Sequence, residues 1–371
     1  MPPLKAAVRA DGSVAFGGRF SVSFQRTLRV PEGTGAGRLP PGLGALPVLA
    51  VDDYAPRVPA AWRERGGVFV PLHPREALWL GFDSPSWHPH AVKVGVGGVN
   101  ALTGGPWSPS LGAGPQDYLV CPPQLWLDGI STAAGEVRQL VAAPLGRGYT
   151  VEAQVTGRER SGGLQLVVYP PRPGRFPEEP PPPREADLPP GAGMLGAPPA
   201  AAFAAGPVEM GIAAGGRIEQ KVYPDPHGAD TWDASAGAAL WVHLLNAEQF
   251  QAVTGRPPPP SPVSARTYTE HGFPWFELVD EGEEDLGRSE LDRVRPLSEL
   301  EREAGEGDAE EPFEIPDGQV VRLHRGDGGD FQIEAVHACT EMVLPEALQG
   351  EAEIVALDER PDNAEARHSG P

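Results

Sequence analysis

Residues 79–107, WLGFDSPSWHPHAVKVGVGGVNALTGGPW, set the first expectations for the fold. From residue 90 to 96, apolar side chains alternate imperfectly with His90, Lys93 and Gly95, a pattern that favours a half-buried β-strand. The glycines that follow, including the pair at 104–105, relax the demand for side-chain packing and favour turns. This stretch therefore predicts a strand followed by tight turns.

The same glycines do not form a nucleotide-binding motif. A dinucleotide fingerprint requires a third glycine where this chain has Asn100, and no Gly-Lys-Ser/Thr follows for a phosphate-binding loop. A cupin-like pairing of two histidines with a nearby glutamate also fails, because no carboxylate occurs between His90 and Asp117. The sequence thus gives no nucleotide chemistry at this place.

Composition extends this β-rich interpretation to the whole chain. The 371 residues include 47 glycines and 45 prolines, which favours short strands and many turns over long helices. We therefore expect a mainly β protein, with a sandwich- or barrel-like domain, a few short helices and a small C-terminal β appendage.

Several elements can be predicted from local pattern. We expect a strand–turn–strand unit over residues 14–30, a short helix over 59–65 and a strand over 68–72. Residues 149–156 and 163–169 alternate clearly enough to predict a β-hairpin. Residues 238–246 predict a buried strand, followed by a helix that Asn246 caps and Gly255 ends.

These patterns divide the chain into segments. The main β domain is expected over residues 1–281, with a proline-rich stretch at 170–207 that is a disordered insertion into one sheet or, alternatively, an interdomain linker. We expect an acidic, solvated or disordered segment over 282–311, a β-hairpin or small sheet over 312–358 and a tail over 359–371.

Charge is unevenly distributed along the chain. The net charge is −21, yet residues 1–175 carry 17 Lys and Arg against 12 Asp and Glu. Residues 277–314 alone hold sixteen acidic side chains and four arginines, and we expect this part to be free rather than docked. The balance argues against direct nucleic-acid binding and favours a partner protein with a basic surface.

Compartment and membrane association can also be predicted. The two cysteines, Cys121 and Cys339, lie far apart in a chain too large to need disulfides, which favours a reducing compartment. The first residues, MPPLKAAVRADG, have no apolar signal-peptide core, and no run of 18 apolar residues occurs. We therefore expect a cytoplasmic protein without a membrane span.

Two groups of residues have the chemistry of metal ligands. His88 and His90 are two apart, so an extended chain places both imidazoles on one face. Asp225, His227 and Asp230 form the densest group of hard ligands in the chain. A divalent metal held by these five residues is one hypothesis; packing at a strand entrance and ordinary turn chemistry are the alternatives.

Three functions are compatible with the sequence. The first is a non-enzymatic cytoplasmic binding or assembly protein, for which the proline-rich and acidic segments argue. The second is a metal-dependent hydrolase that uses the five residues above to activate water. The third is a carbohydrate-binding module, suggested by Trp79, Trp87, Trp107 and Trp126. The catalytic residues remain unassigned in every case.

Four blocks together resemble an uncharacterised bacterial protein family. They are WHPHAVKVGVGGVNALTGGPW, YTVEAQVTG, VYPDPHGADTWD and PVSARTYTEHGFPWFELVDE, which occur in this order. The resemblance covers about residues 14–281 and implies no activity, cofactor or catalytic residue.

Overall fold

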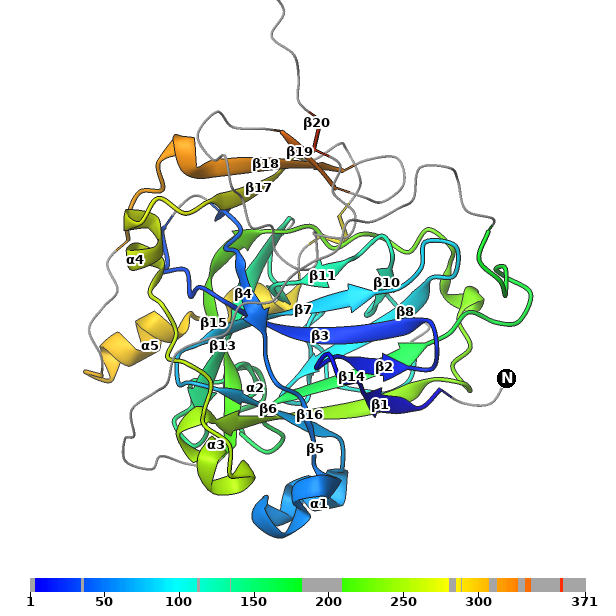
Figure 1. Cartoon of the computed structure of the whole chain (residues 1–371), viewed down its shortest axis with the longest axis horizontal. Coiled ribbons are helices and arrows are strands. Elements are labelled where there is room, and N and C mark those ends of the chain that lie inside the picture. The colour runs from blue at the N-terminus through cyan, green and yellow to red at the C-terminus, as the bar shows by residue number, and fades with distance from the viewer. Residues whose placement is uncertain are drawn as a thin grey trace, which may run out of the picture.

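The computed structural model describes residues 4–34, 37–111, 114–133, 135–181, 209–279, 285–287, 289–306, 312–325, 331–334 and 354–355. Two β-sheets and a few short helices account for most of their regular structure (Figure 1). The prediction of a mainly β protein is therefore confirmed.

Sixteen strands form the large sheet. They are β1 (Ala6–Val8), β2 (Val14–Phe16), β3 (Phe20–Thr27), β4 (Gly42–Ala45), β5 (Leu49–Ala50), β6 (Val68–Leu72), β7 (Ala77–Asp83), β8 (His90–Val96), β9 (Val99–Asn100), β10 (Leu119–Cys121), β11 (Trp126–Leu127), β12 (Gly129–Ser131), β13 (Glu136–Pro144), β14 (Leu164–Tyr169), β15 (Glu209–Glu219) and β16 (Ala238–Asn246). The main path runs β1-β2-β3-β7-β13-β15-β16-β14-β8-β10, and every neighbouring pair on it is antiparallel.

One face of this sheet encloses the main core. Alternate residues of each strand point inward, as Phe20, Val22 and Phe24 do on β3, and all three are at most 1 % exposed. The same alternation on β7, β8, β14, β15 and β16 supplies side chains to the same apolar cluster. Strands from both halves of the path therefore share one core, which requires the sheet to curve around it.

Short helices and turns cover patches of the outer face. The α-helices are α1 (Ala60–Arg65), α2 (Val151–Thr156), α3 (Ala247–Thr254), α4 (Ala265–Glu270) and α5 (Leu297–Glu303), and the 3-10 helices are η2 (Asp52–Arg57), η3 (Ala229–Thr231), η4 (Glu290–Arg293) and η5 (Asp317–Gln319). α1 and α3 share an apolar cluster in which Trp62, Phe69 and Phe250 are buried against the sheet. Leu297 of α5 is buried in another small cluster, whereas Val151 of α2 and Leu291 of η4 belong to the main core.

The predicted hairpin over residues 149–169 is wrong in its first strand. Residues 151–156 form α2, because the Thr150 side chain accepts from the Ala153 backbone N–H and Gly157 ends the helix with a positive φ of 71°. Val151 and Val155 are alternate residues of a strand, but they are also one helical turn apart. The second strand was predicted correctly and is β14.

A second sheet contains the C-terminal strands. Its order is β17 (Trp275–Val279), β18 (Val320–Arg325), β19 (Phe331–Glu334) and β20 (Ile354–Val355). The predicted appendage therefore has its hairpin, β18–β19, but it also takes β17 from the segment assigned to the main domain. Phe276 and Val321 of this sheet pack on Val137 and Ile218 of the large one. A strand that precedes the expected boundary, β17, thus pairs with β18, which follows it.

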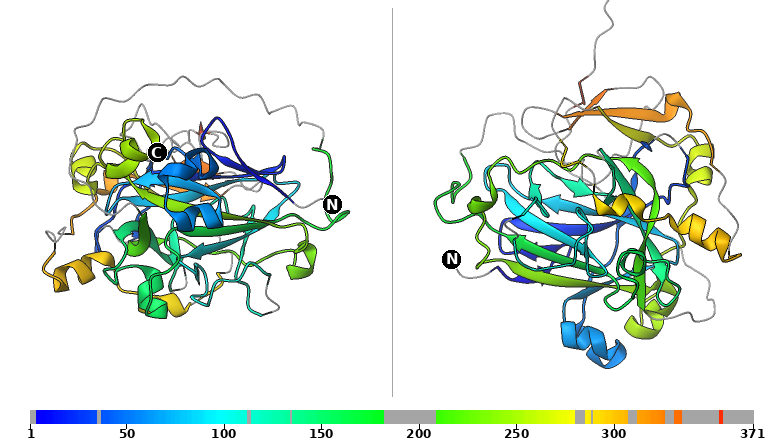
Figure 2. Two further views of the ribbon diagram at one scale, coloured as in Figure 1. Left: turned by 90° about the horizontal axis from the view of Figure 1, so that it is seen from below. Right: turned by 180° about the vertical axis from the view of Figure 1, so that it is seen from behind.

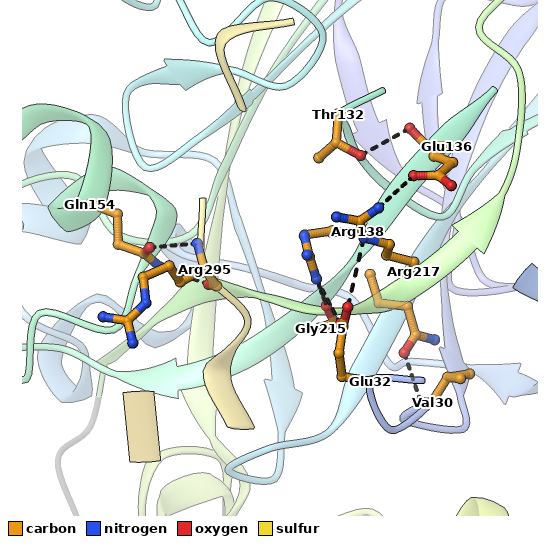
Figure 3. Close-up of polar contacts among 10 residues, drawn as sticks. Val30, Glu32, Thr132, Glu136, Arg138, Gln154, Gly215, Arg217 and Arg295 are labelled. Carbon is orange, nitrogen blue, oxygen red and sulfur yellow. Dashed lines mark hydrogen bonds and ion pairs between the residues drawn. The ribbon is translucent and has the colours of Figure 1, made fainter. Parts of the chain in front are cut away.

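The acidic segment is docked at some of its described residues and exposed at others, such as 302–305, so the expected solvated chain is only partly what the structure shows. Leu291 and Leu297 are completely buried, and Leu291 belongs to the main core. Arg295 exchanges two hydrogen bonds with the Gln154 side chain of α2, at 2.8 and 3.1 Å (Figure 3). The apolar residues placed between the charges explain this docking, because their burial outweighs the repulsion of exposed carboxylates.

The proline-rich stretch joins two strands of one sheet. β14 ends at Tyr169 and β15 begins at Glu209, and both lie in the large sheet. Residues 182–207 of this stretch lie outside the described part of the chain, as do Cys339 and the predicted tail at 359–371.

Candidate functional site

The two predicted ligand groups lie close together and are joined by aromatic rings. Five rings follow one another there, and we call them the aromatic row: Trp232, His227, Phe176, His88 and His90. Along this order the neighbouring ring centroids are 5.9, 5.0, 6.4 and 5.5 Å apart. The Phe176 ring, from the start of the proline-rich stretch, stands between His227 and His88. The three histidines thus lie in one row without converging on one point.

His90 is a buried, neutral member of the row. It is the first residue of β8, is 2 % exposed and packs against Phe20 at a ring distance of 5.3 Å. Burial, reinforced by the nearby charges of His88 and Arg19, lowers the pKa of His90 from 6.5 to about 3. Its Nδ1 lies 3.0 Å from the Ser84 hydroxyl oxygen, within hydrogen-bond distance.

His88 is held by backbone and by an arginine. Its Nδ1 lies 2.8 Å from the Pro177 carbonyl oxygen, which only accepts, so Nδ1 carries the proton. Its Nε2 lies 3.4 Å from the guanidinium of Arg19. The same guanidinium binds Glu178 at 2.9 Å and lies over the Trp87 ring. Both ring nitrogens of His88 are therefore occupied.

Asp225 fastens the loop that carries His227. Its Oδ2 accepts from the Tyr118 hydroxyl at 2.7 Å and from Trp232 Nε1 at 2.8 Å, and its Oδ1 accepts from the His227 backbone N–H at 2.8 Å. Burial and the hydrogen bond to Asp225 raise the pKa of Tyr118, so the phenol keeps the proton that it donates. The carboxylate thereby orders the loop from 225 to 232.

The other two predicted ligands face solvent. Asp230 pairs with Arg175 at 2.6 Å, and His227 exposes its ring beside Phe176. Among the described residues, no group of three or more His, Cys, Asp or Glu side chains is arranged to hold a metal ion. The divalent metal stays a prediction; the five residues engage in hydrogen bonds, an ion pair and ring contacts.

Sequence reasoning missed the most deeply buried charge near this site. Lys93 is 1 % exposed, and its Nζ lies 2.6 Å from both Asp117 Oδ2 and the Ser110 carbonyl oxygen. The alternation in β8 placed Lys93 on a polar face, but Trp107 lies over this side chain, with Nζ 6.0 Å from the centre of the indole ring. Asp117 Oδ1 is buried without a hydrogen-bond partner among the described residues. The sequence signal that could have identified this buried charge is a lysine among the apolar residues of a strand.

The four tryptophans of the carbohydrate hypothesis have four different surroundings. Trp79 is 5 % exposed, and the Trp107 ring packs on Gly95. Trp126 donates from Nε1 to Asp128 at 2.7 Å. Trp87 is half-buried, as Trp107 and Trp126 also are, and its ring contacts that of His88 in the aromatic row.

Charged groups frame the exposed part of the row, and we call this region the row surface. It combines the half-exposed rings of Trp87 and Phe176 and the exposed ring of His227 with a set of charged side chains. The acidic members are five carboxylates: Asp83, Glu178, Glu179, Asp225 and Asp230. The basic members are three arginines: Arg19, Arg172 and Arg175. The row surface is therefore aromatic and net acidic.

No family model, curated protein or solved structure matched this chain in the comparisons. The resemblance to an uncharacterised bacterial family stays a prediction. Within the described residues, no helix has the length and apolar character that crossing a membrane would require.

Proposed function

We propose that this protein is a non-enzymatic cytoplasmic binding or assembly protein whose partner is another protein with a cationic surface. The observation that carries the proposal is the row surface, where half-exposed aromatic rings lie among an excess of carboxylates. Aromatic side chains and arginines dominate the binding energy of protein interfaces, and complementary charge selects and steers the partner. The buried free thiol of Cys121 agrees with a reducing compartment.

The surroundings of His88 and His90 support binding rather than catalysis. A catalytic base needs a ring nitrogen that can reach the substrate proton. His88 has a hydrogen-bonding neighbour at each nitrogen, and His90 is buried with a pKa of about 3. Their contacts position the start of the proline-rich stretch, which carries Phe176 and Glu178 onto the surface.

Internal ion pairs leave the acidic surplus of the chain facing outward. Glu32, for example, lies between Arg138 at 2.7 Å and Arg217 at 3.6 Å, and Arg217 also reaches Glu136 at 3.1 Å (Figure 3). The chain holds 51 Asp and Glu but only 30 Lys and Arg. Lysines and arginines that already form such ion pairs cannot neutralise the remaining carboxylates. This surplus supports a cationic partner over an anionic one.

The proposal can be tested with a lysine decamer as the cationic probe and a glutamate decamer as the opposite probe. Calorimetric titration of the full chain should show binding of the lysine decamer that weakens as salt is raised, and no binding of the glutamate decamer. The double variant Trp87→Ala/Phe176→Ala should weaken binding of the lysine decamer by about tenfold or more, because it removes the rings that anchor the probe.

Phe273→Ala is the matched control, because Phe273 is 51 % exposed and lies near α4, away from the row. This variant should bind the lysine decamer within about twofold of the unaltered chain. Equal weakening in the control and in the double variant, or binding of the glutamate decamer, would contradict the proposed site.

A further inference from the structure

A second feature suited to recognition lies between α3 and α4. Residues 256–263, RPPPPSPV, contain five prolines and lie outside helices and strands, and we call them the proline strap. In Figure 1 the strap is on the side of the molecule opposite the loop by which the chain leaves β14. It is therefore separate from the row surface.

The chemistry of proline sets the conformation of the strap. Each proline ring holds φ near −65°, and each residue that precedes a proline is kept in the extended region. Residues 256–259 and Ser261 all precede a proline. Most of the strap is therefore held in the polyproline II conformation, with three residues per turn.

A buried polar clamp pins this conformation to the domain. The Pro260 carbonyl oxygen accepts from Arg26 at 2.7 Å, and the Pro259 carbonyl oxygen accepts from His73 Nε2 at 3.0 Å. Glu76 holds both donors, since its carboxylate accepts from Arg26 Nε at 2.5 Å and from the His73 backbone N–H at 2.8 Å. The Glu76 side chain is 1 % exposed, so the clamp belongs to the folded core rather than to the surface.

The clamp leaves one edge of the strap facing solvent. With three residues per turn, Pro257, Pro260 and Val263 lie along a single edge, and all three are exposed. Val263 is 50 % exposed, which is unusual for so large an apolar side chain in this protein. Pro258 and Pro259 are half-buried against the domain.

We propose that the proline strap is the ligand of an aromatic-lined, polyproline-binding groove on another protein. Such grooves take prolines at positions i and i+3 of a preformed polyproline II helix, which Pro257 and Pro260 supply. The exposed guanidinium of Arg256 extends the motif toward an acidic rim of the groove. Pinning by Arg26 and His73 lowers the entropy cost of binding, because the strap is already ordered.

The proposal can be tested by titrating the full chain with three recombinant polyproline-binding modules: an SH3, a WW and an EVH1 domain. At least one module should bind with saturation. The double variant Pro257→Ala/Pro260→Ala should weaken that binding by about tenfold or more, because it removes both groove-filling rings. Both prolines are exposed, so thermal melts should show that the variant remains folded.

Pro258→Ala is the matched control, since it changes a neighbouring proline on the half-buried edge and should alter binding less than about twofold. Three results would overturn the proposal. The first is that none of the modules binds the unaltered chain. The second is that binding is lost in Pro180→Ala/Pro181→Ala, which alters the other proline run, and kept in Pro257→Ala/Pro260→Ala. The third is a dimer of the unaltered chain that the Pro257→Ala/Pro260→Ala change dissociates, because the occupant would then be a second copy.

Discussion

At the scale of single residues, two buried titratable groups make the free energy of unfolding depend on pH in opposite directions. Burial raises the pKa of Asp128 to about 7, and burial with neighbouring charge lowers that of His90 to about 3. Each unit of pKa shift corresponds to about 1.4 kcal/mol, so each group affects stability by a few kcal/mol at most. The two effects occupy overlapping pH ranges and must be separated by substitution.

Asp128→Asn isolates the first effect. The Asp128 carboxyl releases its proton near pH 3.8 in the unfolded chain and near pH 7 in the folded protein. The contribution of the protonated carboxyl to folding stability is therefore fully present below pH 3.8 and is lost as the pH rises toward 7. An asparagine oxygen still accepts from Trp126 and Gln220, which bind Asp128 Oδ2 at 2.7 and 3.0 Å. Denaturant titrations should show the variant more stable than the unaltered protein at pH 8 by about 1–3 kcal/mol. A variant that is less stable at pH 8 would count against a buried charge there.

His90→Leu isolates the second effect. The unfolded chain protonates near pH 6.5 while the folded ring stays neutral to about pH 3, so this stability is present above pH 6.5 and lost as the pH falls. The leucine variant should therefore lose less stability than the unaltered protein between pH 6.5 and 4. Denaturant midpoints across this range measure the slope, and an unchanged slope would show that His90 is not the group that titrates.

The row also shows how far single residues can be placed from sequence. His88 and His90 were expected on one face because they are two residues apart, and their rings are indeed neighbours at 5.5 Å. Phe176 could not be placed between His88 and His227, because no local pattern specifies which residue of a proline-rich stretch returns to a distant loop. Contacts across 88 residues of chain depend on the whole sheet rather than on spacing.

At the scale of elements, local signals explain both the success and the failure. The strand at 238–246 and the helix at 247–254 were predicted with the observed bounds, since Asn246 and Gly255 mark the helix ends chemically. α2 carries the same kind of end signals, Thr150 and Gly157, but its two valines also fit a strand. Helix caps were the better guide than a short alternation.

The proline-rich stretch gives a prediction at this scale. Replacing residues 182–207 by a short Gly/Ser linker should change the melting temperature by less than about 2 °C, since such a composition cannot build a core. Replacing residues 172–181 in the same way should lower it by several degrees, because His88 loses Phe176 and the Pro177 carbonyl, and Asp230 loses Arg175. Equal melting temperatures for the two replacements would contradict the packing at the row.

At the scale of the whole molecule, charge alone misled the sequence interpretation of the acidic segment. A count of sixteen carboxylates conceals Leu291, Val294 and Leu297, which are at most 2 % exposed. Glu301 of α5 adds ion pairs to Arg75 at 2.7 Å and to Arg29 at 3.8 Å. The segment is therefore attached chiefly by apolar burial, with ion pairs as a smaller contribution.

Limited proteolysis at two salt concentrations distinguishes these contributions. Glutamate-specific cleavage between 290 and 303 should be slow at both about 0.1 M and about 0.5 M salt, because screening weakens ion pairs but not apolar contacts. Leu291→Ala/Leu297→Ala should be cut faster than the unaltered chain at both concentrations. Protection of the unaltered chain at the lower salt only would show that the ion pairs, and not the leucines, hold the segment.

The elements at the two ends of the molecule are far apart in the fold. α1 lies at one end and the C-terminal sheet at the other, as the rear view in Figure 2 shows. In Figure 1 the chain leaves β14 on the side of the molecule opposite the segment between α3 and α4, and the two proposed binding regions share no residue. This arrangement suits a protein that brings other proteins together.

The most direct test of the binding proposal locates the cationic probe on the molecule. Hydrogen exchange of the full chain, read by mass spectrometry with and without the lysine decamer, reports which backbone segments the probe protects. The row surface predicts slowed exchange in peptides that cover residues 84–90, 172–181 and 225–233. Slowed exchange confined to the acidic segment at 277–314, with those three regions unchanged, would contradict the assignment of the binding site.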